Sequence, residues 1–354
     1  MIGRNDTDFA AIGYEQAHRD GEDMGTIAVR AEYILGADGS LTLASDQEIV
    51  LVDEYAGDPH RTPLLRPADL VPFKPGADVT VLGRTFPPNG LDEAREWICG
   101  VRVGERRHFL RANGPRRWRR ERKGWRLEPA EPVAFVDLDY RNAWTDRPTP
   151  GGDPPQENPL GLAPLAEDVT DEVVEAFALP SLDRPAEAYD EPHTPRSPAG
   201  FGPVPPFWRL RQRHAGTYDE TWLAERHPYL PRDFDYRFYQ CAHPDLVVPG
   251  YLSGEEEVEL ARLLPGGRNL HLRLPGIELA ATYRWRDGRE VRQKLNLDGL
   301  HVDLREAPYR LALTWRGWLP ICPNFLRIDL EAAERASSLF ADLPPAALHG
   351  LEAA

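Results

Sequence analysis

The sequence has few cysteines, and their spacing does not suit a disulfide framework or a zinc site. Cys99, Cys241 and Cys322 are far apart and form no CxxC pair. An odd number at this spacing is typical of a reducing compartment. No run approaches the roughly 18 apolar residues that a membrane span needs, and residues 1–9 lack the apolar core of a signal peptide. We therefore expect a cytoplasmic protein that does not enter a membrane.

The motifs that mark common enzyme classes are also missing. There is no Walker-type phosphate loop, no GxSxG, no HExxH, and no GxGxxG that opens a helix after a strand. The ten histidines are scattered, and no two are four residues apart, the spacing that places two zinc ligands on one helix face. The sequence therefore predicts a protein that is not an enzyme and has no cofactor and no metal.

Positive charge is scarce. Asp and Glu number 57 against 42 Lys and Arg, which gives a formal net charge of −15. Such a chain as a whole repels nucleic acid and anionic membranes. A protein is therefore the expected partner, and no oligomeric state is predicted.

The sequence does contain many short β-type segments separated by turns. With 35 prolines and 29 glycines, long helices are excluded as the main element. Alternating or β-branched segments predict a first antiparallel β-sandwich lobe over residues 9–141. Its expected strands are residues 25–35, 41–43, 48–53, 78–83, 98–103, 108–112 and 124–127.

The alternation is lost over residues 142–247, where prolines crowd together. A long irregular segment is expected to be pinned across a surface or to carry function. Two short helices are predicted in it, at residues 168–177 and 219–226. For the second, Thr217 or Asp219 is the expected N-cap, and Trp222 is expected to be buried beneath the helix.

Regular short strands return over residues 248–330 and predict a second antiparallel β lobe. The Ala-rich tail, residues 331–354, predicts a helix. The fold class is therefore mainly β: two antiparallel β-sandwich-like lobes joined by a long Pro-rich irregular segment, with few short helices. The expected strands of the second lobe are residues 257–264, 270–274, 277–283, 291–295, 299–304 and 309–315.

Asp219, Asp233 and Asp235 form the one carboxylate group that could carry acid–base chemistry. On that hypothesis the protein is a β-sandwich hydrolase acting on a glycan or peptide. The alternative is structural: Asp219 caps a helix, and the other two carboxylates hold turns near arginines.

Residues 102–126 are strongly basic in this acidic chain, and tryptophans are interleaved with the arginines. Three explanations remain open. The segment could bind nucleic acid, pair internally with Glu255, Glu256 and Glu257, or dock an acidic protein. Exposed tryptophans would anchor an interface, whereas buried ones would pack the core. The predicted partner-binding residues are Arg117, Trp118, Arg119, Arg120, Trp208, Arg211, Tyr218 and Trp222.

Eight segments spread over nearly the whole chain carry a family resemblance. Among them are Pro198-Ala-Gly-Phe-Gly-Pro203, Ala215-Gly-Thr-Tyr-Asp-Glu-Thr-Trp222 and Leu230-Pro-Arg-Asp-Phe-Asp235. In order, the eight resemble the blocks of the type VI secretion adaptor family first catalogued as domain of unknown function 2169. The other five are residues 73–83, 114–118, 158–161, 208–211 and 313–316.

This resemblance implies a cytoplasmic adaptor or chaperone that binds a secreted effector protein and helps load it onto the VgrG spike and its PAAR tip. It supplies no catalytic residues. Besides the hydrolase, a structural component associated with the spike is a third hypothesis, and it predicts a stable symmetric oligomer.

Overall fold

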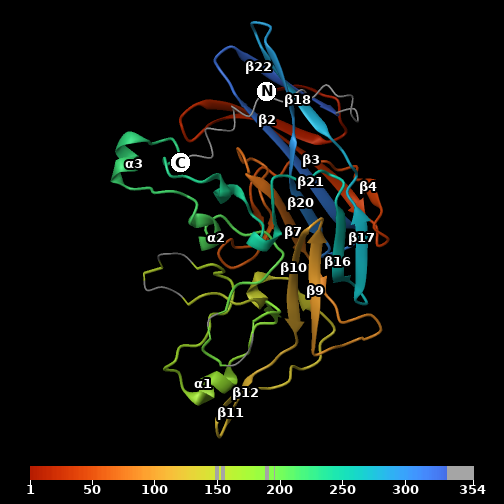
Figure 1. Cartoon of the computed structure of the whole chain (residues 1–354), viewed down its shortest axis with the longest axis vertical. Coiled ribbons are helices and arrows are strands. Elements are labelled where there is room, and N and C mark those ends of the chain that lie inside the picture. The colour runs from red at the N-terminus through yellow and green to blue at the C-terminus, as the bar shows by residue number, and fades with distance from the viewer. Residues whose placement is uncertain (148–150, 153–155, 188–190, 195, 333–354) are drawn as a thin grey trace.

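The computed structural model describes residues 1–147, 151–152, 156–187, 191–194 and 196–332 (Figure 1). Strands dominate these residues, so the predicted mainly β fold is confirmed. The helices are short: α1 covers Asp171–Ala176, α2 Arg209–Gln212 and α3 Glu220–Glu225. None of the helices in the described ranges has the length and apolar character to cross a bilayer.

A seven-stranded sheet forms the centre of the molecule (Figure 1). Its neighbouring strands are antiparallel, except that β7 and β20 run parallel. In order across the sheet, the strands are β15 (Val247–Pro249), β7 (Gly76–Leu82), β20 (Asn296–Asp303), β21 (Tyr309–Pro320), β3 (Asp23–Leu35) and β2 (Ala10–Ala17), with β4 (Leu41–Leu43) paired to β3.

A five-stranded antiparallel sheet packs against the central sheet. Its order is β14 (Leu182–Asp183), β10 (Arg106–Asn113), β9 (Glu96–Val103), β16 (Glu257–Leu264) and β17 (Arg268–Arg273). A four-stranded sheet lies at one end of the long axis, and a small hairpin lies at the other end with α1 (Figure 1). The four-stranded sheet comprises β1 (Ile2–Asn5), β22 (Phe325–Ala332), β18 (Leu279–Trp285) and β19 (Glu290–Lys294), and the small pairs are β11 (Trp118–Glu121) with β12 (Gly124–Leu127), β13 (Val136–Asp137) with β8 (Arg84–Thr85), and β5 (Glu54–Tyr55) with β6 (Leu64–Arg66).

Strands from both predicted lobes share the two large sheets. β3 pairs with β21 from Met24 opposite Pro320 to Leu35 opposite Tyr309. β9 pairs with β16. Residues 9–141 and 248–330 are therefore joined by backbone ladders, and not only through the segment between them. Local alternation predicts each strand but says nothing about which distant strand it meets.

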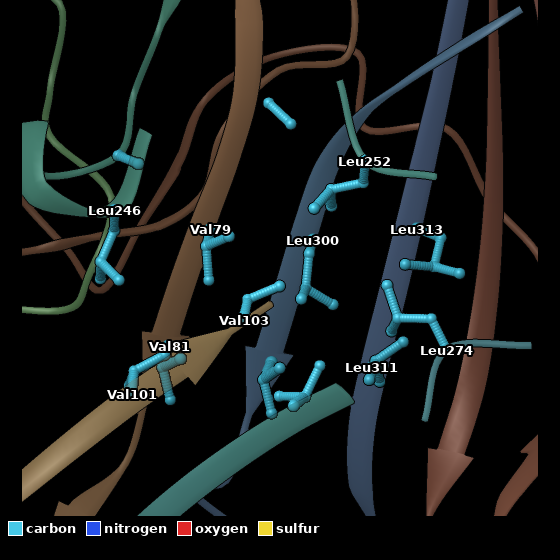
Figure 2. Close-up of a cluster of buried hydrophobic side chains, with 14 of the residues drawn as sticks. Val79, Val81, Val101, Val103, Leu246, Leu252, Leu274, Leu300, Leu311 and Leu313 are labelled. Atoms are coloured by element: carbon cyan, nitrogen blue, oxygen red, sulfur yellow. The ribbon is translucent and has the colours of Figure 1, made fainter. Parts of the chain in front are cut away.

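The hydrophobic core fills the space between the two large sheets. Val79 of β7, Val101 of β9 and Leu311 of β21 are buried in one cluster. Figure 2 shows these side chains between the ribbons, together with Leu300 and Leu313. On β9 every second residue points inward, as expected for a sheet with one solvated face.

The other face of the central sheet buries charged side chains. Arg316 forms an ion pair with Asp298, and both are almost fully buried. The Arg30 guanidinium lies 2.7 Å from Glu32. Asp69 accepts the Val50 backbone N–H at 2.9 Å. Because an unpaired buried charge costs several kcal/mol, these pairs require the chain segments that cover this face to lie in one position.

The described parts of residues 142–247 bond to both large sheets. β14 adds to the edge of β10. The Val81 backbone N–H donates to the Phe201 carbonyl at 2.8 Å. The carboxylate of Asp78 on β7 accepts the backbone N–H groups of Cys241 and Ala242 at 3.0 and 3.1 Å. The segment is irregular, yet its backbone groups bond to strands.

Two predicted elements differ in the structure. Residues 48–53 were expected to form a strand but contain none. The Val50 carbonyl accepts the Asp69 backbone N–H, and the Val50 N–H donates to the Asp69 carboxylate, so Val50 pairs with no strand. The predicted tail helix over residues 331–354 is wrong at its start, since β22 continues to Ala332 with Ile328 and Leu330 buried against β18. Residues 333–354 lie outside the described residues.

The pair formed by Asp78 and Lys74 allows a stability test of the buried charges. The Lys74 ammonium lies 2.9 Å from the Asp78 carboxylate. Burial alone would raise the pKa of Asp78, but Lys74 and the bonded N–H groups hold that pKa below its ordinary value. Asp78→Asn removes the ion-pair partner of the buried Lys74, so we expect the free energy of unfolding to fall by about 3–5 kcal/mol in denaturant titrations.

Asp46→Asn is the matched control, because Asp46 pairs with Arg310 at 2.8 Å on the surface. The free energy of unfolding of this variant should fall by less than about 1 kcal/mol. Equal losses in the two variants would show that the buried pair places no special constraint on the fold.

Candidate partner-binding surfaces and a histidine cluster

Three of the eight predicted partner-binding residues are buried. Trp118 packs in a small cluster with Trp144 and Val174. Trp208 is fully buried and meets the ring of Tyr140 edge-on, with centroids 5.1 Å apart. Because both tryptophans are buried, they pack the interior of the free chain, as most tryptophans do.

Arg211 is buried as well, and its guanidinium bonds to main-chain carbonyls. It donates to the Phe238 carbonyl at 2.7 Å and to the Val204 carbonyl at 3.0 Å. Arg211 therefore ties α2 to the neighbouring segments of the chain.

The other three basic residues lie on the exposed β11–β12 hairpin and its approach. Arg119 lies 3.2 Å from Glu128, and Arg120 lies 3.3 Å from Asp171 at the start of α1. Arg117 is exposed, and no ion pair to it occurs among the described residues. The hairpin is thus partly neutralised from within, but by a different set of acids from the one predicted.

The acids predicted to neutralise this segment are engaged elsewhere. Glu255 pairs with Arg273, and Glu256 accepts the backbone N–H groups of Ser253 and Gly254. These acids lie at or just before the start of β16 in the five-stranded sheet, whereas the β11–β12 hairpin is a separate pair of strands beside α1 (Figure 1).

Tyr218 and Trp222 lie on a projecting segment, residues 216–233, which we call the α3 finger. In Figure 1, α3 stands out at the left edge of the molecule. Its large apolar side chains are unusually exposed: 52% for Tyr218, 61% for Leu223 and 42% for Tyr229. No residue of α3 is buried. Large apolar side chains gathered on a fixed projection are typical of a surface that another protein covers.

Two carboxylates of the hydrolase hypothesis hold this finger in shape, and the third caps the turn that follows it. Asp219 caps α3 by accepting the Trp222 backbone N–H at 2.8 Å, as predicted for an N-cap. Asp233 accepts the Thr217 backbone N–H at 3.0 Å and its hydroxyl at 2.7 Å. Asp235 caps the 3-10 turn Tyr236–Tyr239. Each carboxylate therefore has a structural hydrogen-bonding role.

Trp222 is not buried beneath the helix, so that prediction is wrong. Its ring is half-exposed and meets Tyr218 edge-on at 4.7 Å, while its indole N–H donates to the Tyr229 carbonyl at 2.9 Å. A helix of six residues is too short to cover a ring of this size. Phe234, by contrast, is fully buried.

A second cluster, absent from the sequence predictions, joins β10 to residues 243–246. The rings of His108 and His243 stack with centroids 4.4 Å apart. The Nδ1 atom of His108 lies 3.2 Å from the Asp245 carboxylate. Arg184 bonds to the same carboxylate oxygen. No short motif links residues so far apart in the sequence, so only the fold reveals the cluster.

His108, His243 and Asp245 are the one group in the described ranges whose ligand atoms lie close enough together to hold a metal. Their existing bonds oppose that use. Arg184 already brings a positive charge to Asp245, and the Nδ1 atom of His243 accepts the Asp245 backbone N–H at 3.2 Å. The arrangement serves better as a hydrogen-bonded joint between β10 and the 3-10 turn Pro244–Leu246.

A charged cavity of about 140 Å³ lies on the polar face of the central sheet. The opposite charges along its wall pair with each other: Arg66 lies 2.6 Å from Glu48. His301 also lines it, and its Nδ1 atom lies 2.8 Å from the Thr80 hydroxyl. A lining that is already paired offers little free charge to a ligand.

The comparisons with known proteins give one match. Residues 20–316 match the family described as "Uncharacterized protein conserved in bacteria (DUF2169)". The chain belongs to the DUF2169 family. No curated protein and no solved structure matches it.

In this DUF2169 chain, the conspicuous motif Pro198–Pro203 is a packing element. A Cβ atom at Gly200 would lie 2.5 Å from the Tyr140 ring, so only glycine fits there. Phe201 is fully buried against the core. This motif therefore fixes the wrapping segment, whereas the Ala215–Trp222 motif builds the exposed finger.

The histidine cluster predicts how stability depends on pH. Burial lowers the pKa of His108 and His243, and for His108 the neighbouring imidazole adds to the effect. Below the ordinary pKa of 6.5, the unfolded chain then binds more protons than the folded chain. The free energy of unfolding should therefore fall as the pH drops through this range.

His243→Asn keeps a side chain that can cap Pro244–Leu246 but removes one titrating group. Between about pH 6.5 and pH 5, we expect the slope of unfolding free energy against pH to decrease by up to about 1.4 kcal/mol per unit. Denaturant titrations at several pH values measure it. Identical slopes for both proteins would contradict the assignment of neutral, buried histidines.

Proposed function

We propose that this DUF2169 chain is a non-catalytic adaptor that binds a partner protein through preformed surfaces. The α3 finger carries the proposal. Tyr218, Leu223 and Tyr229 leave apolar area in water that a partner could cover. The Asp233–Thr217 clasp and the Asp219 cap fix the finger in the free chain, which reduces the entropy lost on binding.

Further bonds fix the finger to the body of the protein. The Arg226 guanidinium donates to the Arg19 carbonyl and to the Leu230 carbonyl. Arg19 in turn donates to the Phe234 carbonyl at 2.9 Å. A partner docked on the finger would therefore be held at a defined position relative to the central sheet.

The partner that we propose is a secreted effector of the type VI system, which the adaptor would hold in the cytoplasm and help load onto the VgrG or PAAR spike proteins. The resemblance of eight ordered segments to adaptors of that system supports this assignment. The structural roles of Asp219, Asp233 and Asp235 agree with a binding protein, because these carboxylates are committed to backbone and side-chain donors.

The test is a binding titration with effector and spike proteins encoded beside this chain. Leu223→Asp places a charge on the exposed helix α3 and leaves Thr217, Asp219 and Asp233 unchanged. We expect the dissociation constant to rise at least about tenfold, a loss of roughly 1.4 kcal/mol, with the thermal midpoint unchanged. Isothermal calorimetry measures the dissociation constant, and differential scanning fluorimetry measures the thermal midpoint.

Leu91→Asp is the matched control, since Leu91 is exposed by 52% on a different loop. Its binding should equal that of the wild type. If Leu223→Asp binds as tightly as Leu91→Asp, the finger is not the docking surface. If the wild type binds none of these proteins, the proposed secretion role fails.

A further inference from the structure

The outer edge of β10 is paired over only part of its length. β14 covers Arg111 and Ala112, and the Asn113 backbone N–H donates to the Ser181 carbonyl. Towards the β9–β10 turn, no strand of the described chain continues this pairing. Among the described residues, the edge beside Arg107 and Phe109 therefore has no strand partner, and we call it the open edge.

The register shows which backbone groups face this edge. The two-residue turn after Val103 makes Val103 and Arg106 the closing hydrogen-bonded pair of the hairpin. In an antiparallel ladder every second residue bonds to the partner strand, so His108 and Leu110 bond to β9. The N–H and C=O groups of Arg107 and Phe109 consequently point away from β9, towards the open edge.

A groove of about 530 Å³ lies beside this edge, with apolar side chains in its wall. Phe109 is 42% exposed and Ile98 is 38% exposed. Pro185 and Ala186, which follow β14 in the sequence, also line the groove. The Phe109 ring lies over Gly100, where any side chain would displace it: a Cβ atom would come within 2.4 Å.

The charge around the groove is positive, in a chain whose net charge is −15. Arg107 is exposed, and within the described ranges no carboxylate pairs with it. Within the described ranges, Arg184 forms an ion pair only with Asp245, and the same carboxylate also lies beside His108. A carboxylate entering the groove would therefore meet an uncompensated guanidinium at Arg107.

We propose that the open edge of β10 binds an extended acidic segment of a partner protein, which adds to the sheet as a strand in line with β14. Backbone pairing with Arg107 and Phe109 would supply affinity, as in other cases of strand addition. An apolar side chain would cover Phe109 and Ile98, and a carboxylate would face Arg107. This surface is separate from the α3 finger.

The same charges argue against a second copy of this chain as the occupant. Two open β10 edges placed side by side would bring Arg106 and Arg107 of one copy near the same basic residues of the other. Like charges on neighbouring strands are destabilising, and charged side chains are a common means of preventing self-association at sheet edges. An acidic strand meets no such penalty.

The probe is a short fluorescent peptide with the repeat Glu-Thr-Val-Thr, titrated into the full-length chain at low salt. Glutamate and valine then lie on the same face of the added strand, as Arg107 and Phe109 do on β10. We expect saturable binding by anisotropy. Arg107→Glu should weaken it at least about tenfold. Arg122→Glu is the matched control on the exposed β11–β12 turn and should leave binding unchanged.

Two further peptides test the backbone pairing. Each carries N-methyl groups on every second amide, and the two peptides differ in which set of amides is methylated. Only one set of amides in an added strand faces β10, so only one of these peptides should lose binding.

Several outcomes would overturn the proposal. These are no binding of the acidic peptide, equal losses in Arg107→Glu and Arg122→Glu, equal binding of both methylated peptides, or binding of a lysine–valine peptide as tight as that of the acidic one. A wild-type dimer in sedimentation that Phe109→Ala dissociates would assign the edge to self-association instead. Leu223→Asp should bind the peptide normally, so this test is independent of the finger.

Discussion

Charge buried on one face of the central sheet is the constraint on which the rest of the fold depends. Arg30, Asp298 and Arg316 lie on strands from opposite ends of the chain, and they are shielded from water by loops that contribute Asp69 and Lys74. Removing one partner of such a pair lowers the stability of the fold strongly, because the other charge stays buried and unpaired. The intact pair itself stabilises the fold little relative to well-packed apolar side chains. The loops are therefore confined to one arrangement. Asp78 on the same face also holds Cys241 and Ala242 in place through their backbone N–H groups.

Much of the local structure was predictable from the sequence, and most of the tertiary structure was not. The strands predicted at 257–264, 41–43 and 124–127 coincide with β16, β4 and β12, because alternation and turns are local signals. The pairing of β3 with β21 depends on contacts almost 300 residues apart, which no local pattern encodes.

Part of the candidate site was likewise predictable from the sequence, and part was not. The sequence identified Asp219 as a cap, since capping depends on a few neighbouring residues. It could not separate the buried Trp208 from the exposed Tyr218, because both are large amphipathic rings. The open edge of β10 and the stacked His108 and His243 result from strand order and long-range packing, so only the structure reveals them.

The central claim is that partners bind to surfaces already formed in the free chain, with the interior unchanged. Hydrogen–deuterium exchange of the full-length protein, alone and in complex with a bound effector, tests it most directly. We predict slower exchange in the complex at the amides of residues 216–233 and at Arg107 and Phe109, with β3, β20 and β21 unaffected. Protection confined to the charged cavity around Glu48 and Arg66, with the finger and the β10 edge unchanged, would contradict it.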